Sequence, residues 1–253
     1  MQINGSTILV TGASGGLGNA IARDLKARGA SLVLSARNVA LLDALAAELE
    51  AEVLVADLAD RADVARVAER ASTCDVLVAN AGVGDDPTLD DLDDEAIDFA
   101  IDVNLRAPMV LANAFAKAHI AAGTPGQIVL VGSLAGLAAS PGTRLYNATK
   151  FGLRGFSLSF SQELEGTDVG CSLVAPGFIR DASMFHEGGI ELPVGVRTKA
   201  PQDVADGVVR AITHSPAEVF VAPVELRLAS TLATVAPALS ATIQKKLNVA
   251  DRR

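Results

Sequence analysis

The sequence predicts an α/β fold in which helices cover both faces of a doubly wound parallel sheet. Three observations support this: short apolar runs recur along the chain, helix-prone segments separate them, and a glycine-rich turn joins the first run to the first helical segment. Alternation of strand and helix over several units is typical of this architecture. No linker or internal repeat interrupts the pattern, so we expect residues 1–253 to form a single domain.

The apolar runs are nearly continuous and do not alternate with polar residues. Such runs indicate strands that are buried on both faces, as in parallel sheets. Seven of them are expected to form strands: 7–10, 31–35, 52–56, 75–80, 127–132, 171–175 and 218–222. Between them, segments such as 17–29 and 38–50 carry Ala and Leu at helical spacing, and Gly29 ends the first of these.

Composition argues against several classes of protein. The chain has a net charge of −9, so it lacks the broad positive surface that attracts nucleic acid or anionic membranes. It begins without the basic start of a secretory signal, and no uninterrupted apolar stretch reaches membrane-spanning length. We therefore expect a cytoplasmic protein with no nucleic-acid partner, and membrane association is not favoured.

No metal site is expected. Cys74 and Cys171 follow no metal-ligand spacing and each opens an apolar run, so we interpret them as small core residues in a reducing compartment. The three histidines are far apart, although His186 is left open as a substrate contact. The acidic segment 84–99 fits no EF-hand spacing, and we interpret it as a solvated loop leading into a helix with carboxylates in its first turn.

A glycine-rich turn, TGASGGLG at 11–18, joins the first strand to the first helix. Gly12, Gly16 and Gly18 would let the backbone turn sharply and let a pyrophosphate approach the amide groups. The helix that follows would present its unpaired N–H groups and the positive end of its dipole to that phosphate. The position of the turn between a buried strand and a helix predicts a dinucleotide site rather than an ordinary tight turn.

The end of the second strand indicates which dinucleotide is bound. NAD sites usually carry an acidic residue there, about 20 residues beyond the glycines, that bonds the ribose 2′-hydroxyl. Here the stretch SLVLSARN holds no carboxylate, and Arg37 takes that place. A guanidinium can hold a 2′-phosphate through its charge and paired hydrogen bonds. We therefore favour NADP(H), with NAD(H) left open and an ordinary surface arginine as the plain alternative.

Further motifs follow in order along the chain. After the glycine turn come NAG at 80–82, VNL at 103–105, Ser133 after the fifth strand, YNATK at 146–150 and PG at 176–177. In this combination, from about Thr7 to about Pro223, the sequence resembles the short-chain dehydrogenase/reductase family. The resemblance implies a Rossmann-type sheet of about seven strands and an oxidoreductase that uses a nicotinamide dinucleotide.

The resemblance also implies a set of cofactor-binding residues. The phosphate turn would comprise Thr11, Gly12, Ser14, Gly15, Gly16, Leu17 and Gly18. Asp57 and Leu58 match the adenine-contacting segment, Asn80, Ala81 and Gly82 match the segment that lines the adenosine ribose, and Pro176, Gly177 and Ile179 match the segment beside the nicotinamide. Asp181 stands where the family often has a threonine that bonds the carboxamide, which leaves open whether the Ile179 backbone makes that contact alone.

The catalytic tetrad of the family matches Asn104, Ser133, Tyr146 and Lys150. Tyr146, the only tyrosine, would be the general acid/base, and Lys150 lies one helical turn later on the same face. A free phenol has a pKa of about 10, so we expect the lysine charge, and then the charge of the oxidised nicotinamide, to lower the pKa of Tyr146.

The other tetrad roles also come from the resemblance. Ser133 would donate a hydrogen bond to the substrate oxygen, and Lys150 would bond the nicotinamide ribose. Asn104 would hold a water that links Lys150 to solvent, with a purely structural amide as the alternative.

Substrate choice is expected to depend on the segment 177–201, which we interpret as a mobile lid with a largely apolar inner side. Phe178, Met184 and Phe185 would line a pocket together with Leu134 and Ala135, although each is equally plausible as loop packing. A moderately apolar alcohol or ketone is the expected substrate, and the sequence names no single compound.

The segment 225–248 is apolar and helix-prone, and it leads to a basic end. We expect it to pack on the body of the protein or on a partner subunit, and association with an anionic membrane surface is the alternative left open. Two-fold assembly is the commonest arrangement of oligomers, and the family resemblance implies a homodimer or homotetramer.

Together these observations predict an oxidoreductase that transfers a hydride between NADP(H) and a carbonyl or secondary alcohol. Two alternatives stay open on the same fold: an epimerase or dehydratase, and a cofactor-binding regulator without turnover. Ser133, Tyr146 and Lys150 in a chain without an added substrate domain favour simple carbonyl chemistry. A pure binding module has no need of Tyr146 and Lys150 together.

Overall fold

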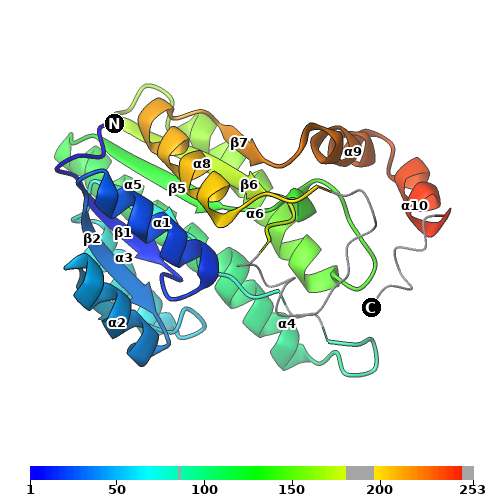
Figure 1. Cartoon of the computed structure of the whole chain (residues 1–253), viewed down its shortest axis with the longest axis horizontal. Helices are drawn as coiled ribbons and strands as arrows, with labels where there is room; N and C mark the ends of the chain where they lie inside the picture. Colours follow the sequence, from blue (N-terminus) through cyan, green and yellow to red (C-terminus); the bar gives the residue numbers. More distant parts are fainter. Residues whose placement is uncertain (85–86, 181–196, 247–253) are drawn as a thin grey trace.

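Seven parallel strands form one sheet in the computed structural model, which describes residues 1–84, 87–180 and 197–246 (Figure 1). The strands are β1 Thr7–Thr11, β2 Ser31–Ala36, β3 Glu52–Val55, β4 Val76–Ala79, β5 Gly126–Val131, β6 Val169–Pro176 and β7 Glu218–Val221. Their order across the sheet is β3-β2-β1-β4-β5-β6-β7. The predicted doubly wound fold is confirmed, and each strand ends within a residue or two of its predicted run.

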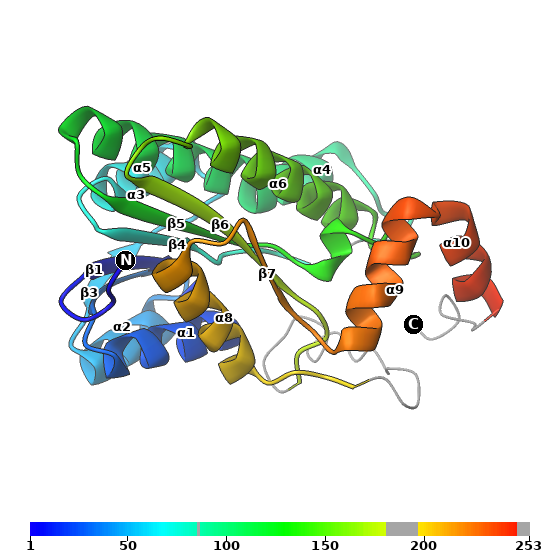
Figure 2. The same cartoon turned by 90° about the horizontal axis from the view of Figure 1, so that it is seen from above.

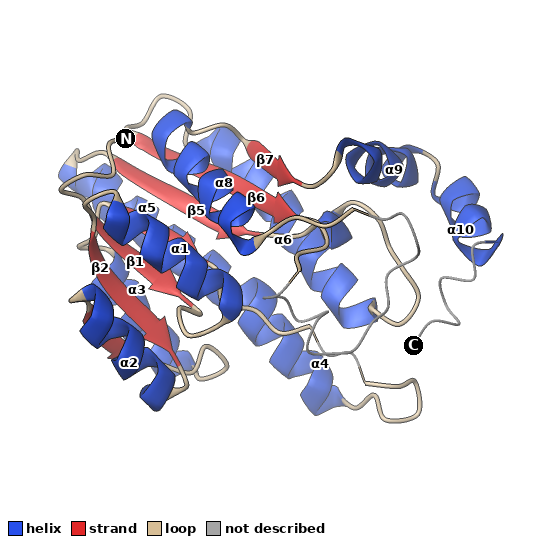
Figure 3. Ribbon diagram, viewed as in Figure 1, coloured by secondary structure: helices blue, strands red, loops and turns tan. Residues whose placement is uncertain are grey.

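Helices cover both faces of the sheet, as Figures 2 and 3 show. One layer consists of α1 Gly16–Ala27, α2 Val39–Leu49 and α8 Pro201–His214. The opposite side carries α3 Arg61–Ala71, α4 Asp94–Ile101, α5 Ala107–Ala122 and α6 Arg144–Glu163. Along β1, Ile8 and Val10 belong to the apolar core of the first layer, while Leu9 belongs to the core of the second. Burial on both faces explains why the strand sequences are continuous apolar runs.

The strand β3 contradicts the expected burial on both faces. It lies at the edge of the sheet, where Val53 and Val55 are 36% and 38% exposed. An edge strand pairs on one side only, and the covering helices do not extend over all of its side chains. Glu52 on this strand accepts two hydrogen bonds of 2.8 Å from Arg70 of α3, and such a charged pair discourages unwanted pairing along the open edge.

Both cysteines lie in the apolar core, as predicted. Cys74 and Cys171 are free and buried, and burial raises the pKa of each thiol to about 11. Thiols of this kind are protonated at neutral pH and are poor nucleophiles, so they act here as small apolar residues.

The acidic segment leads into α4, as the sequence predicts. Asp93 caps this helix by accepting a hydrogen bond of 2.8 Å from the Ala96 amide, and Asp94 and Glu95 occupy the first turn. Carboxylates at this end of a helix stabilise it by satisfying free amides and by interacting with the helix dipole.

The order of the strands reverses between β1 and β4. β1 pairs with β2 on one side and with β4 on the other, although β4 follows β3 in the chain. The loops that leave β1 and β4 therefore turn to opposite faces of the sheet, and a crevice opens beyond the carboxyl ends of these strands. Ligands of doubly wound sheets bind at this position.

The C-terminal segment forms two helices, α9 Val224–Val235 and α10 Pro237–Lys246, which lie beyond the carboxyl ends of the strands (Figure 1). Leu226 of α9 packs against Leu134, Leu137 and Ala222, so the expectation that this segment packs on the body holds for that face of α9. None of the described helices combines the length and apolar character needed to cross a bilayer.

Phe115 provides a test of the packing. It is fully buried in α5 and stacks on His119 with ring centroids 4.2 Å apart. We expect Phe115→Ala to lower the free energy of unfolding by about 3–5 kcal/mol, because the change removes buried apolar area and leaves a cavity. Urea denaturation followed by circular dichroism would measure this.

Ile120→Ala on the same helix is the matched control, because its side chain is 49% exposed. Its effect should stay within about 0.5 kcal/mol. Equal losses from the two substitutions would contradict this account of the core.

Candidate active site

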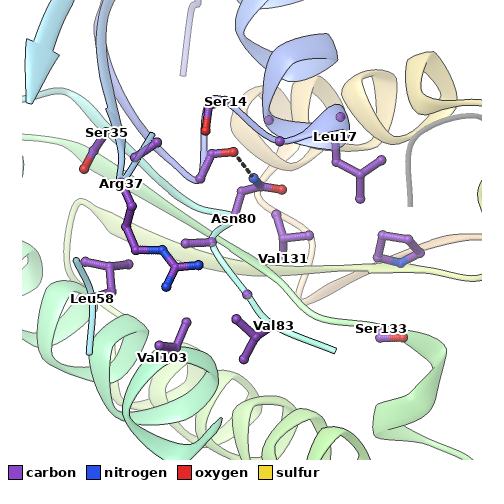
Figure 4. A pocket seen from close by; sticks show the side chains of 18 of the residues that line it. Ser14, Leu17, Ser35, Arg37, Leu58, Asn80, Val83, Val103, Val131 and Ser133 are labelled. Atoms are coloured by element: carbon purple, nitrogen blue, oxygen red, sulfur yellow. Dashed lines mark hydrogen bonds between the residues drawn. The ribbon is translucent and has the colours of Figure 1, made fainter. Parts of the chain in front are cut away.

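A cleft of about 650 Å³ opens at the switch point between β1 and β4 (Figure 4). All but one of the residues predicted to bind the cofactor line it, namely Gly12, Ser14, Gly15, Gly16, Leu17, Gly18, Arg37, Asp57, Leu58, Asn80, Ala81, Gly82, Tyr146, Lys150, Pro176, Gly177 and Ile179. Ser133 also lines it. The cleft thus joins the glycine turn, the end of β2 and the tyrosine–lysine pair in one continuous space.

The glycine turn forms one wall of the cleft. Gly12 has a φ of +65°, and a Cβ atom at this position would lie 2.7 Å from the Cα of Ala81. A Cβ atom on Gly18 would lie 2.1 Å from the carbonyl oxygen of Gly12. Residues with side chains therefore fit at neither position. α1 begins at Gly16 without a side-chain cap, so its first amides are open to a bound anion.

Thr11 is the exception among the predicted cofactor-binding residues, because it is buried behind the cleft wall. Its hydroxyl oxygen accepts hydrogen bonds of 3.1 Å from the amides of Asn80 and Ala81. The Asn80 side chain in turn donates to the carbonyl oxygens of Thr11, at 3.1 Å, and Gly12, at 3.3 Å. Thr11 thus holds the end of β4 against the glycine turn, and its direct contact with a phosphate, expected from the sequence, is not supported.

Arg37 extends from the end of β2 into the cleft (Figure 4). Its guanidinium lies 4.0 Å from a carboxylate oxygen of Asp57 and 5.8 Å from the ring centroid of Phe99. About half of each charged side chain, 56% of Arg37 and 45% of Asp57, is exposed. An ion pair this long and this exposed contributes little stability, so the guanidinium can still bind an anionic ligand.

Asn104 lies behind the cleft in a short π-helix, η1 Asp102–Arg106, which joins α4 to α5. Its side-chain oxygen accepts from the Val83 amide and its side-chain nitrogen donates to the Val83 carbonyl, both at 2.8 Å. The same nitrogen lies 3.3 Å from the Thr149 hydroxyl. These bonds give Asn104 a structural role, while its predicted water link to Lys150 stays a prediction. Single π turns inside helices are frequent at functional sites.

Gly82 separates Asn104 from Lys150. A Cβ atom on Gly82 would lie 3.1 Å from the Asn104 side-chain oxygen and 3.5 Å from the Lys150 Nζ. The absence of a side chain at this position therefore lets Asn104 and Lys150 approach the same point of the cleft.

Ser133, Tyr146 and Lys150 come together at the other end of the cleft. Ser133 follows β5, and its hydroxyl caps the short 3₁₀ helix η2 Leu134–Gly136 by accepting from the Ala135 amide at 3.1 Å. The Ser133 side chain also hydrogen-bonds the Tyr146 phenol. Lys150 donates to the Val131 carbonyl at 3.1 Å and lies 5.6 Å from the Tyr146 ring centroid.

Burial is the main influence on the pKa values of Tyr146 and Lys150. It raises the pKa of Tyr146, and the hydrogen bond from Ser133 opposes this only in part. It also lowers the pKa of Lys150 to about 8. The groups of the chain alone therefore hold the pKa of Tyr146 above its ordinary value, and the lowering expected from Lys150 and the oxidised nicotinamide stays a prediction. The reason is that transferring the phenolate of Tyr146 from water to the protein interior costs more free energy than the single hydrogen bond from Ser133 contributes.

The predicted substrate pocket is supported less well. Leu134 is buried in an apolar cluster with Leu137 and Ala222 and does not line the cleft, and neither does Ala135. Phe178 is half-buried. Met184, Phe185, Asp181 and His186 lie outside the described residues.

The two ends of the substrate segment are joined by backbone hydrogen bonds. The Arg180 amide donates to the Lys199 carbonyl, and the Lys199 amide donates to the Phe178 carbonyl, both at 2.9 Å. The intervening Ile179 is buried and lines the cleft. The start and end of the segment are therefore fixed beside the cleft.

Sequence reasoning missed several lining residues, which are Ser35, Ala36, Asn38, Ala56, Val83, Val103, Val131 and Gly132. Most directly adjoin predicted residues at the carboxyl ends of strands. Adjacency to the motifs is the signal that could have found these. Phe99 beneath Arg37 carried no such signal, because it approaches from α4 only in the folded chain.

Comparison with known proteins places this geometry in a family. The family described as "short chain dehydrogenase" matches residues 6–189. The chain belongs to this family. The 3-oxoacyl-[acyl-carrier-protein] reductase FabG of Rickettsia conorii is 36% identical over 82% of this chain and 89% of that protein. FabG of Escherichia coli K12 is 34% identical over 82% of this chain and 90% of that protein.

Solved structures of short-chain dehydrogenases have the same fold. A short-chain dehydrogenase from Sphingobium yanoikuyae in complex with NADPH has a TM-score of 0.79 and 30% identity, covering 96% of this chain and 95% of that one. A metagenomic short-chain oxidoreductase in complex with NADP has a TM-score of 0.73 and 37% identity, covering 88% of this chain and 99% of that one. This chain is accordingly an NAD(P)-dependent oxidoreductase that acts on CH–OH groups or the matching carbonyls.

Lys150 makes a pH-dependent contribution to stability that can be measured. Its pKa is about 8 in the folded chain and 10.5 ordinarily, so between these values the unfolded chain binds a proton that the folded chain has lost. The free energy of unfolding should therefore increase with pH in this window, by up to about 1.4 kcal/mol per unit for one proton. Urea denaturation of the wild type and Lys150→Met at pH 8 and pH 9 tests this.

The buried thiols and the phenol are present in both proteins, so their titration cancels in the comparison. The wild type should gain more stability between the two pH values than Lys150→Met does. Parallel pH profiles would show that Lys150 keeps its ordinary pKa in the folded protein.

Proposed function

We propose that this dehydrogenase transfers a hydride between NADP(H) and a ketone, aldehyde or secondary alcohol, with Tyr146 as general acid/base. The observation that carries this proposal is the meeting of Ser133, Tyr146 and Lys150 at one end of a cleft whose other end is built from the glycine turn and Arg37. We also propose that residues 1–253 act as one domain, in the cytoplasm, and assemble as a homodimer or homotetramer.

The residues of the cleft fit a dinucleotide. Gly12 and Gly18 leave room for a pyrophosphate where a Cβ atom would clash with backbone, and the uncapped start of α1 offers amides to it. Asp57 and Leu58 would face the adenine, and Pro176, Gly177 and Ile179 would face the nicotinamide. When bound, the cofactor supplies the hydride chemistry and the positive charge of its oxidised ring.

Arg37 supports a preference for NADP(H). It occupies the end of β2, no carboxylate lies in that strand, and its guanidinium is half exposed beside the cleft. A dianionic 2′-phosphate can displace the weak contact with Asp57, because it offers more charge and paired acceptors. Two of the similar structures, described above, contain NADPH or NADP.

Tyr146 would donate its phenolic proton to the carbonyl oxygen as that oxygen gains charge. The Ser133 hydroxyl, which hydrogen-bonds the phenol in the free chain, would turn its single proton to the same substrate oxygen and stabilise it. The Val131 carbonyl fixes the Lys150 ammonium beside the phenol. Because burial lowers the pKa of Lys150 to about 8, the ammonium is charged at neutral pH yet able to pass on a proton. Asn104 would then hold the water that connects it to solvent.

The substrate is proposed to be a moderately apolar carbonyl compound or alcohol. The walls near the catalytic group include Val131, Pro176 and Ile179, which offer no charge to a ligand. No feature of the described residues favours an epimerase, a dehydratase or a regulator over carbonyl reduction.

Removal of the phenolic proton tests the catalytic role. In Tyr146→Phe we expect kcat to fall by about 10²–10⁴-fold, because general acid catalysis is lost. The dissociation constant for NADPH, from fluorescence titration, should change less than about threefold. Turnover is followed by NADPH absorbance with a panel of ketones and aldehydes.

Ser161→Ala is the matched control, because it removes a hydroxyl that bonds the Leu158 carbonyl within the same helix α6. It should keep wild-type turnover. A Tyr146→Phe enzyme with near-normal kcat would refute the assignment.

Arg37→Gln tests the choice of dinucleotide. We expect the KM for NADPH to rise about tenfold or more, which corresponds to about 1.4 kcal/mol of lost phosphate binding. The KM for NADH should stay within about threefold, because NADH has no 2′-phosphate. Arg66→Gln serves as control, since Arg66 is an exposed arginine paired with Asp63 on α3. Equal increases in the KM for NADPH and the KM for NADH would show that Arg37 does not recognise the 2′-phosphate.

A further inference from the structure

Two side chains from distant parts of the chain flank the guanidinium of Arg37. One is the carboxylate of Asp57, whose oxygen lies 4.0 Å from a guanidinium nitrogen. The other is the ring of Phe99, whose centroid lies 5.8 Å from the guanidinium carbon. Neither contact is a hydrogen bond, because hydrogen bonds between nitrogen and oxygen are about 3 Å long. The two neighbours therefore leave the N–H groups of Arg37 free for a ligand.

Phe99 reaches Arg37 from α4, on the side of this helix that faces the cleft. Val103, four residues later in the π-helical turn η1 that continues α4, is buried and lines the cleft. Residues four apart lie on the same side of a helix. The ring of Phe99 is thus placed beside the part of the cleft into which Arg37 extends (Figure 4).

The helix that carries the ring is anchored at both ends. Asp93 caps its start, and Asn104, just after its end, makes two hydrogen bonds of 2.8 Å to the backbone of Val83 in the loop that follows β4. The Arg37 side chain is in contrast long and 56% exposed. A ring on a fixed helix restricts the positions of such a side chain, and a restricted guanidinium loses less entropy when it binds an anion.

The ring and the carboxylate would affect a bound phosphate in opposite ways. The carboxylate of Asp57 competes with a phosphate for the charge and the N–H groups of Arg37. An aromatic ring attracts the cation through its electron-rich face and has no oxygen that accepts those N–H groups. The other carboxylate oxygen of Asp57 accepts from the Ala59 amide at 3.0 Å, so Asp57 is held in place when the guanidinium moves away from it. The contact with Phe99 can therefore persist when a phosphate replaces Asp57.

We propose that Phe99 is a positioning residue for Arg37. Its ring holds the guanidinium in the cleft, where the guanidinium would bind the 2′-phosphate of NADP(H). Phe99 thereby contributes to the selection of NADP(H) over NAD(H) without touching the phosphate itself. This inference rests on the proposed role of Arg37 in binding the 2′-phosphate.

Two other roles for the ring predict different effects on cofactor binding. A ring that stacks on the adenine would act equally on NADPH and NADH, because both contain adenine. A ring that only stabilises α4 would also affect the two dinucleotides alike. A ring that acts through Arg37 affects NADPH alone, since NADH has no 2′-phosphate.

Fluorescence titration of the full chain with NADPH and with NADH tests the proposal. Phe99→Leu keeps an apolar side chain and removes the ring, so the dissociation constant for NADPH should rise about threefold or more. The constant for NADH should stay within about 1.5-fold of the wild-type value. Phe99→Tyr keeps the aromatic face and should bind NADPH as the wild type does. In the Arg37→Gln background, Phe99→Leu should have no further effect, because the cation is gone.

Ile101→Ala is the matched control. Ile101 lies on the same helix and is 40% exposed where Phe99 is 37% exposed, and residues two apart do not share a side of a helix. Both dissociation constants should stay at their wild-type values in this variant, and all variants should keep the wild-type circular dichroism.

The inference would be overturned if Phe99→Leu weakened NADPH and NADH binding equally, or weakened neither. It would also be overturned if Phe99→Leu had the same effect with and without Arg37. A selective loss of NADPH affinity in Arg37→Gln but not in Phe99→Leu would refute this inference and leave the proposed function standing. Unchanged NADPH affinity in Arg37→Gln would refute the proposed role of Arg37 and this inference with it.

Discussion

The close approach of the glycine turn to the end of β4 is the contact on which the site depends. At Gly12 the backbone has a positive φ and passes so near to Ala81 that no Cβ atom fits between them. The Thr11 hydroxyl and the Asn80 side chain hold the two segments together with four hydrogen bonds. Because β1 and β4 are fixed in this way, the cleft lies over their ends and the first amides of α1 face it.

The catalytic end of the cleft is governed by burial. Tyr146 and Lys150 are 7% and 4% exposed, and burial shifts both pKa values toward the neutral forms of the side chains. A neutral phenol is the form that donates a proton, while a lysine with a pKa of about 8 can exchange one near neutral pH. The Val131 carbonyl and the Ser133 hydroxyl satisfy the polar atoms that burial would otherwise leave without partners.

Charge is distributed unevenly along the sequence. Carboxylates concentrate at the start of α4, where they stabilise the helix, while the sequence from residue 226 to residue 246 has none.

The sequence by itself determined the order of the strands and helices and the glycine turn, because periodicity and motif spacing are local properties of a chain. The tetrad was predicted from the resemblance of the motifs to those of the family. The sequence could not show that β3 lies exposed at an edge, that Thr11 supports the cleft from behind, or that Leu134 packs under α9. Nor could it show that burial raises the pKa of Tyr146, or that Phe99 approaches Arg37 from α4. These features depend on which distant segments the fold brings together and how much water it excludes between them, and only the tertiary structure decides both.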